Sequence, residues 1–194
     1  MTKNKTDLPN RKTDLDKRLL LQPELWHQRP VPQKLIGLAA QQFPGRWMGI
    51  DWGTKRIGIA LSDPGMRIAN GHLVFDHKRQ GHSFAAIAKL VASHQISCIV
   101  LGLPLSMDGN KSPRTQAVMQ IGWNWFKSGH TTPVLLFDER LSTQASQRML
   151  IETVDMGRMR RRQIIDKLSA AWFLQNALDR IANDQAMNLE RTET

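Results

Sequence analysis

The alternation of apolar and polar positions predicts a β-hairpin around Asp51. Apolar residues lead up to Asp51 as in a buried strand, Gly53 and Thr54 interrupt the strand, and period-2 alternation resumes from Arg56 to Leu61. The hairpin therefore places the carboxylate of Asp51 near the end of a first, central strand. An Asp is seldom buried unless it is paired or binds a metal. Because Asp is also an ordinary turn former, the hairpin alone leaves both roles open.

After the hairpin, short apolar runs alternate with segments of helical periodicity. Three runs have the length and composition of strands, namely His72–Phe75, Ile96–Leu101 and Pro133–Phe137. Periodicity and helix-start signals predict helices over His82–Ser93, from Pro113 onwards, after Ser142 or Thr143, and over Ile164–Ala182. An antiparallel hairpin followed by alternating helices and apolar strands predicts an α/β fold, a mixed sheet with helices on both faces.

Residues 1–45 differ in character from the rest of the chain. They hold eight Lys or Arg, four acids and five scattered prolines. This composition favours a largely disordered basic extension with one short helical piece around Lys34–Gln42. The extension is expected to be a solvated tail, with a dedicated RNA-binding arm as the alternative. The sequence thus predicts a folded domain over residues 46–184 and a C-terminal tail over residues 185–194.

Acidic side chains are expected to gather where the strands end. Asp51 leaves the first strand, and Asp138 and Glu139 follow the later strand that ends at Phe137. In open α/β sheets, sites lie beyond the carboxyl ends of the central strands. These acids are therefore candidates for one shared site.

Asp166 is the third member of this set. It begins the last helix and shares the apolar face of that helix with Ala170, Phe173, Leu174 and Ala177, so it is expected to face inward. The alternative explanation is the preference of acids for the positive end of a helix dipole. That preference accounts for the position of Asp166 along the helix but not for its face.

Carboxylates held close together repel one another unless cations lie between them. The candidate ligands are all oxygen atoms, and the sequence has no Cys or His cluster, which favours Mg²⁺ or Mn²⁺ over Zn²⁺. Two such ions about 4 Å apart form the usual site for in-line displacement at phosphorus. The pattern therefore indicates metal-dependent chemistry on a phosphodiester.

The net charge and the cysteine content limit which binding partners and which cellular compartment are expected. The net charge of +10 favours an anionic partner, and nucleic acid more than a membrane surface. No apolar segment approaches the ~18–20 residues of a spanning helix, and no secretory signal is expected in the polar first twenty or so residues of the sequence. Cys98 is the single cysteine. A disulfide framework and a cysteine-bound zinc are therefore excluded, and a reducing cytoplasm is expected.

Four segments resemble, in order and spacing, the motifs of the YqgF proteins, also called RuvX. The segments are Gly49–Gly58, Gly102–Gly109, Asp138–Thr143, and Asp166–Ala171 with Leu174 and Gln175. The resemblance covers about Arg46 to Arg180. It implies a ribonuclease H-like fold, which the family shares with the Holliday junction resolvase RuvC.

The resemblance also carries an expected activity. Members of the family are described as nucleases that mature the 5′ end of precursor 16S rRNA in the bacterial cytoplasm, and in older descriptions as Holliday junction resolvases. The resemblance implies that Asp51, Glu139 and Asp166 are the catalytic, metal-binding acids, with Asp138 as the neighbour held in reserve. Trp52 stands where a smaller or different apolar residue is more usual, and its side chain should point away from the site.

Basic and polar residues near these motifs are the candidates for substrate binding. They are Thr54, Lys55, Arg56, Asn110, Lys111, Arg114, Arg140, Arg160 and Arg161. Those beside the helix start at Pro113 gain from backbone N–H groups that can also bind phosphate. For the basic residues of the hairpin turn, and for those of a basic loop expected over Gly157–Gln163, the alternative to substrate binding is that their charges are simply solvated. Pairing with Asp138 is the alternative for Arg140.

Other functions fit parts of the same pattern. The acids would serve equally in DNA junction resolution, which requires a symmetric dimer because two strands are cut. A non-catalytic rRNA-binding assembly factor is a further alternative, although bare acids would repel an RNA backbone. The segment Asp51–Thr54 also resembles the phosphate-binding turn of sugar kinases and actin-like ATPases, but those proteins need two such lobes. Monomer and homodimer both stay open.

Overall fold

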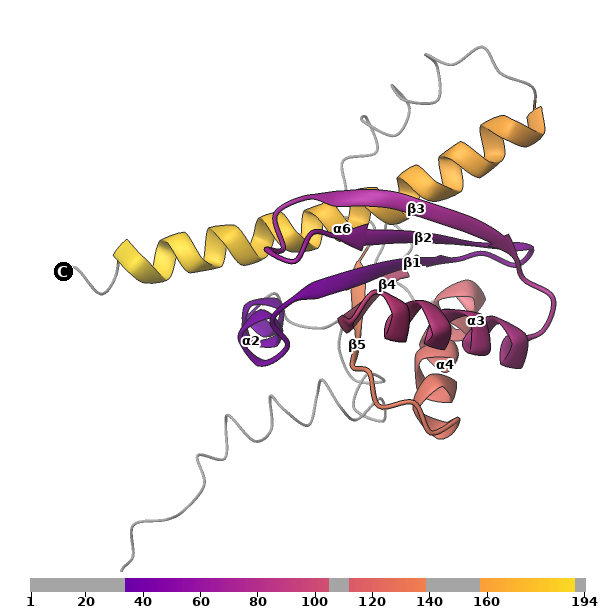
Figure 1. The fold of residues 1–194 in the computed structure, drawn as a ribbon, viewed down its shortest axis with the longest axis horizontal. Helices are drawn as coiled ribbons and strands as arrows, with labels where there is room; N and C mark the ends of the chain where they lie inside the picture. Colours follow the sequence, from indigo (N-terminus) through magenta and orange to yellow (C-terminus); the bar gives the residue numbers. More distant parts are fainter. Residues whose placement is uncertain (1–33, 105–111, 139–157, 191–194) are drawn as a thin grey trace, which may run out of the picture.

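The computed structural model describes residues 34–104, 112–138 and 158–190. Figure 1 shows the elements in chain order, which are α2 (Lys34–Gln42), β1 (Arg46–Trp52), β2 (Arg56–Ser62), β3 (Ala69–Asp76), α3 (Gln80–Ser93), β4 (Ile96–Leu103), α4 (Pro113–Lys127), β5 (Val134–Asp138) and α6 (Arg158–Glu190). Every strand predicted from the apolar pattern is present. The helix that Ser142 or Thr143 was expected to cap lies outside the described residues.

The strands form one mixed sheet in the order β3-β2-β1-β4-β5. β1 pairs with β2, and β2 with β3, in antiparallel fashion, whereas β4 runs parallel to both β1 and β5. This arrangement confirms the predicted fold class, an antiparallel hairpin followed by parallel strands. As a result β1 is the central strand, and the carboxyl ends of β1, β4 and β5 share one edge of the sheet, the carboxyl edge.

A tight turn between β1 and β2 depends on Gly53. Its N–H donates to the carbonyl of Arg56 over 3.0 Å, and a Cβ on Gly53 would lie only 2.5 Å from that carbonyl oxygen. A side chain at this position would therefore break the closing hydrogen bond. The hairpin turn at the carboxyl edge requires glycine for this reason.

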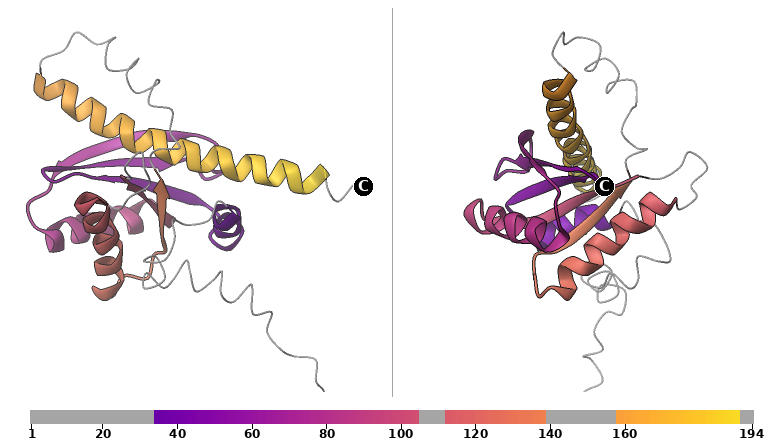
Figure 2. Two further views of the ribbon diagram at one scale, coloured as in Figure 1. Left: turned by 180° about the vertical axis from the view of Figure 1, so that it is seen from behind. Right: turned by 90° about the vertical axis from the view of Figure 1, so that its right-hand side faces the viewer.

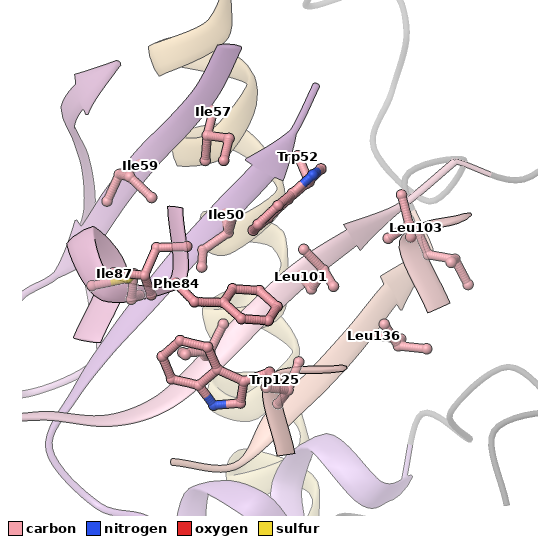
Figure 3. Close-up of a cluster of buried hydrophobic side chains, with 14 of the residues drawn as sticks. Ile50, Trp52, Ile57, Ile59, Phe84, Ile87, Leu101, Leu103, Trp125 and Leu136 are labelled. Carbon is pink, nitrogen blue, oxygen red and sulfur yellow. The ribbon is translucent and has the colours of Figure 1, made fainter. Parts of the chain in front are cut away.

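Two clusters of buried side chains cover the two faces of the sheet. The residues Met48 and Ile50 of β1 belong to the cluster that α3 and α4 complete, and Figure 3 shows Ile50 and Trp52 in it beside Phe84. Trp47 belongs to the other cluster, which α2 and α6 complete. Figure 2 shows α6 on one side of the sheet and α3 and α4 on the other. Helices on both faces were expected from the continuous apolar strands.

The first described helix, α2, lies before residue 46, where the sequence analysis began the folded domain. It has the bounds expected for the short helical piece in the extension. Its residues Ile36, Ala39 and Ala40 are buried against the cluster that includes Phe173 and Leu178 of α6. α2 is therefore part of the packing on the α6 face of the sheet.

Helix α6 begins earlier in the chain than the sequence pattern predicted. A basic loop was predicted over Gly157–Gln163, but the helix already begins at Arg158 and continues to Glu190. The predicted helix over Ile164–Ala182 is thus present but too short at both ends. Arg, Met and Gln are good helix formers, and Arg158–Gln163 contains neither Gly nor Pro to stop the helix.

Among the helices that the structure describes, none combines the length and the apolar character needed to cross a bilayer.

Candidate functional site

Asp51 lies near the end of β1, on the face of the sheet that α6 covers. Two residues before it, Gly49 faces α6 so closely that a Cβ there would lie 2.8 Å from the carbonyl oxygen of Ala170. Trp47, two residues earlier still, is fully buried in the α6 cluster. Because alternate residues of a strand share a face, Asp51 faces α6 as well. Its side chain is partly buried.

The direction of α6 brings its first half to the carboxyl edge. Lys167 lies against Gly71 of β3, and further along α6 the side-chain carbonyl of Gln175 accepts the N–H of Ala69, the first residue of β3, over 2.8 Å. Since β3 runs in the same direction as β1, residue numbers in α6 fall toward the carboxyl edge. The backbone of Asp166 therefore lies toward the end of the sheet where β1 leaves Asp51.

The third strand end contributes its backbone to the same edge. β5 ends at Asp138, which pairs in register with Leu103 at the end of β4. The structure describes no side chain for Asp138 or Asp166, and Glu139 lies outside the described residues. Within the described part of the chain, no group of three or more His, Cys, Asp or Glu side chains could hold a metal.

The hairpin turn places three of the expected substrate-binding residues beside Asp51. Thr54 and Lys55 are exposed, and Arg56 is partly exposed at the start of β2. The N–H of His77 donates to the carbonyl of Lys55 over 2.8 Å, which ties the turn to the end of β3. The turn therefore stands as a fixed basic feature of the carboxyl edge.

Arg114 approaches this edge from α4. The side chain of Ser112 caps α4 by accepting the N–H of Thr115, and the hydroxyl of Thr115 donates to the carbonyl of Pro104, directly after β4. The exposed Arg114 thus stands beyond the carboxyl end of β4.

The remaining candidates fall in two groups. Asn110, Lys111 and Arg140 lie outside the described residues, whereas Arg160 and Arg161 belong to the first turns of α6, with no side chain described. Their expected roles stay predictions.

One cluster of basic side chains was not predicted from the sequence. Lys78, Arg79 and His82 are exposed and line a hollow of about 300 Å³ together with Phe75, Asp76 and Ser83. We call this feature the β3–α3 hollow. It adjoins the hairpin turn, because Asp76 pairs in register with Arg56. The missed signal was a pair of basic residues immediately after a strand end, the same context that singled out Lys55 and Arg56.

The described groups with shifted pKa values lie away from the carboxyl edge. Burial, and then the positive charges of His94 and Lys167, lower the pKa of His72 in β3. Burial raises the pKa of the Cys98 thiol far above its usual range. Hydrogen bonds from the N–H groups of Ile68, Arg67 and Gly65 lower the pKa of Asp63 in the β2–β3 turn. None of these three groups stands at the carboxyl edge. Because the Cys98 thiol is fully buried in the core, it is excluded as a metal ligand at that edge.

The chain is similar to proteins of one known family over most of its length. Residues 45–180 match the family model described as "RuvX: Holliday junction resolvase". A protein of Phenylobacterium zucineum named "Putative pre-16S rRNA nuclease" is 39% identical over 136 residues, which cover 70% of this chain and 87% of that protein. A protein of Thermoanaerobacter pseudethanolicus with the same name is 39% identical over 134 residues, covering 69% and 96% of the two chains. Among solved structures, T. thermophilus RuvC in complex with Holliday junction substrate matches with a TM-score of 0.46 and 13% identity, over 69% of this chain and 93% of that one.

Proposed function

The chain belongs to the RuvX family, and we propose that it is a metal-dependent nuclease that hydrolyses phosphodiester bonds in RNA. The proposed substrate is precursor 16S rRNA, because relatives that are 39% identical to this chain over 136 and 134 aligned residues are named as pre-16S rRNA nucleases. We further propose that cleavage matures the 5′ end of this RNA in the cytoplasm. The net charge of +10 suits a polyanionic substrate.

The observation that carries the proposal is the placement of Asp51. A carboxylate that is partly buried at the end of the central strand faces the one helix that also contains Asp166. Asp166 precedes Ala170 by four residues, about one helical turn, and Ala170 meets β1 at Gly49. Two acids far apart in sequence are thus carried by neighbouring elements on one face of the sheet.

The alternation of β5 favours Glu139 over Asp138 as the remaining acid. Leu135 and Phe137 both belong to the α6 cluster, whereas Leu136 belongs to the cluster on the opposite face. Glu139 stands two positions after Phe137 in the sequence, so a continuation of the same alternation would give it, and not Asp138, the α6 face. We therefore propose Asp51, Glu139 and Asp166 as the catalytic acids.

These residues fit Mg²⁺ or Mn²⁺. The proposed donors are carboxylate oxygens, which hard divalent cations prefer, and the one cysteine is fully buried in the core, away from this edge. Divalent cations bound here would lower the pKa of an attacking water and offset charge on the leaving oxygen. The chain's own contribution would be to hold these carboxylates in place, with Asp51 on the central strand, so that a phosphodiester is aligned for in-line attack.

Basic and polar residues around the same edge would hold the phosphate backbone. Thr54, Lys55 and Arg56 stand in the turn beside Asp51, and Arg114 stands beyond the end of β4. We add Lys78, Arg79 and His82 of the β3–α3 hollow to this set. We also retain Asn110, Lys111, Arg140, Arg160 and Arg161 as proposed contacts.

The family description favours a second candidate, cleavage of a four-way DNA junction. The chemistry would be identical, but two strands would have to be cut by a symmetric dimer. A monomer in solution would count against this candidate, and a stable dimer would favour it.

The test compares cleavage of a labelled precursor 16S rRNA leader with cleavage of a labelled DNA junction, in Mn²⁺ and in EDTA. Wild type is assayed beside Glu139→Gln and a matched control, Asp179→Asn, which alters an exposed acid on α6. RNA cleavage that requires metal and Glu139 supports the proposal. Cleavage of the junction alone would favour the resolvase. Tight RNA binding without any cleavage would leave a non-catalytic assembly factor.

A further inference from the structure

Helix α6 rests on the sheet at two glycines. A Cβ added to Gly49 of β1 would lie 2.8 Å from the carbonyl oxygen of Ala170 and 2.9 Å from Cβ of Leu174. A Cβ added to Gly71 of β3 would lie 3.1 Å from both Cβ and the carbonyl oxygen of Lys167. Separations below 3.0 Å are not tolerated between a Cβ and another heavy atom, so at Gly49 the helix or the strand would have to move.

The two glycines lie in one row across the sheet. Gly49 pairs in register with Ala60 of β2, and Ala60 pairs with Gly71. Ala60 is fully buried in the cluster that contains α6. These three small residues thus form a shallow trough across three strands, and the backbone of α6 lies in it.

The points of contact flank the proposed acids. Lys167 directly follows Asp166, Ala170 follows it by four residues, and Gly49 precedes Asp51 by two. Two of the closest atoms are main-chain carbonyl oxygens, which a change of side-chain rotamer cannot move away. We propose that Gly49 and Gly71 are positioning residues, which set how closely the turn of α6 that carries Asp166 approaches Asp51. This inference rests on the proposed function of those two acids.

A second contact makes the first half of α6 the part that would move. The Gln175 amide accepts from the N–H of Ala69 over 2.8 Å and donates to the carbonyl of Arg67 over 3.0 Å. This pair of hydrogen bonds fixes α6 to the start of β3. A methyl group inserted at Gly71 would therefore tilt the helix about Gln175 and displace the end that bears Asp166.

The test uses Gly71→Ala and Gly49→Ala, with Gly81→Ala as the matched control. Gly81 lies in the first turn of α3, and a Cβ there would meet no atom within 4 Å. Each protein is characterised by its melting temperature, its Mn²⁺ affinity by calorimetry, and kcat and KM for cleavage of the RNA leader. Metal affinity and the split between kcat and KM separate positioning from a merely structural effect.

We expect Gly71→Ala to fold, because a shift of a few tenths of an ångström relieves its contacts. Its Mn²⁺ affinity and its kcat should each fall about tenfold, with KM for RNA within about twofold of wild type, since displacements well under 1 Å matter in a preorganised site. Gly49→Ala should lose more Mn²⁺ affinity and more kcat than Gly71→Ala, whereas Gly81→Ala should match wild type in both quantities.

Wild-type Mn²⁺ affinity and kcat in a folded Gly71→Ala protein would overturn the inference and leave the proposed function standing. An unfolded Gly71→Ala protein would also overturn it, because the glycine would then be needed for folding itself. A wild-type protein that neither binds Mn²⁺ nor cleaves RNA would overturn the proposed function and, with it, this inference.

Discussion

Asp51 and Trp52 are neighbours in β1 whose side chains face opposite sides of the sheet. The Trp52 ring contacts Phe84 edge to face, with 5.7 Å between ring centroids, in the cluster under α3 and α4. Asp51 faces α6, as its alternation with Gly49 requires. The pleat of one strand thus separates a core anchor from a proposed catalytic acid, and this separation agrees with the expectation that Trp52 points away from the site.

Because of this separation, Trp52 should affect stability and leave the chemistry intact. Truncation of a buried Trp usually costs about 3–5 kcal/mol, so Trp52→Ala should be strongly destabilised in urea unfolding. The milder Trp52→Phe variant should remain folded and keep kcat within about threefold of wild type, because its side chain stays on the core face. A large loss of kcat in stable Trp52→Phe would contradict the assignment of the two faces.

The β3–α3 hollow should strengthen RNA binding without taking part in catalysis. Lys78→Ala combined with Arg79→Ala should weaken binding and reduce the dependence of log K on log salt by about two, roughly one for each phosphate that is no longer neutralised. The matched control is Lys89→Ala combined with Lys127→Ala, which removes two exposed charges elsewhere. Equal salt slopes for the two double variants, measured by fluorescence anisotropy, would exclude the hollow from the binding surface.

His72 should make the fold less stable in mild acid. Burial and neighbouring positive charge hold the pKa of His72 below its usual range, so the unfolded chain binds the extra proton more readily. The contribution of His72 to stability is therefore fully present above the pKa of the unfolded chain. It is lost as pH falls through the lower pKa of the folded state. Urea unfolding between about pH 7.5 and about pH 5 should show a shallower decline for His72→Gln than for wild type. Parallel curves for the two proteins would refute this role.

Most elements of the fold could be predicted from the sequence. Short apolar runs and one period-2 segment mark the strands, helical periodicity marks the helices, and Gly53, Pro104 and Pro113 mark breaks between them. The prediction failed at Arg158–Gln163, where a run of basic residues without an apolar period suggests a loop, although its residues favour helix. Local pattern sets an element's type more reliably than its ends.

For the candidate site, the sequence predicted that Asp51 lies near the end of a central strand, and the structure places it there. It did not single out Lys78 and Arg79, although both follow the end of β3. The pairing of Arg56 with Asp76, which places the hollow beside Lys55, is a register between strands and cannot be read from the local sequence. The trough at Gly49 and Gly71 was missed for the same reason, since three strands must be aligned before their small residues form one row.

The catalytic role of Asp51 is tested by cleavage of the labelled RNA leader in Mn²⁺ by Asp51→Asn, beside Asp179→Asn as the control for loss of one carboxylate charge. We expect that Asp51→Asn keeps its melting temperature in EDTA, no longer gains stability from Mn²⁺, and loses at least about a thousandfold in kcat, because a catalytic acid that holds metal contributes several kcal/mol to lowering the barrier. Asp179→Asn should cleave like wild type. Cleavage by folded Asp51→Asn within about tenfold of wild type would contradict the claim that Asp51 is a catalytic, metal-binding acid.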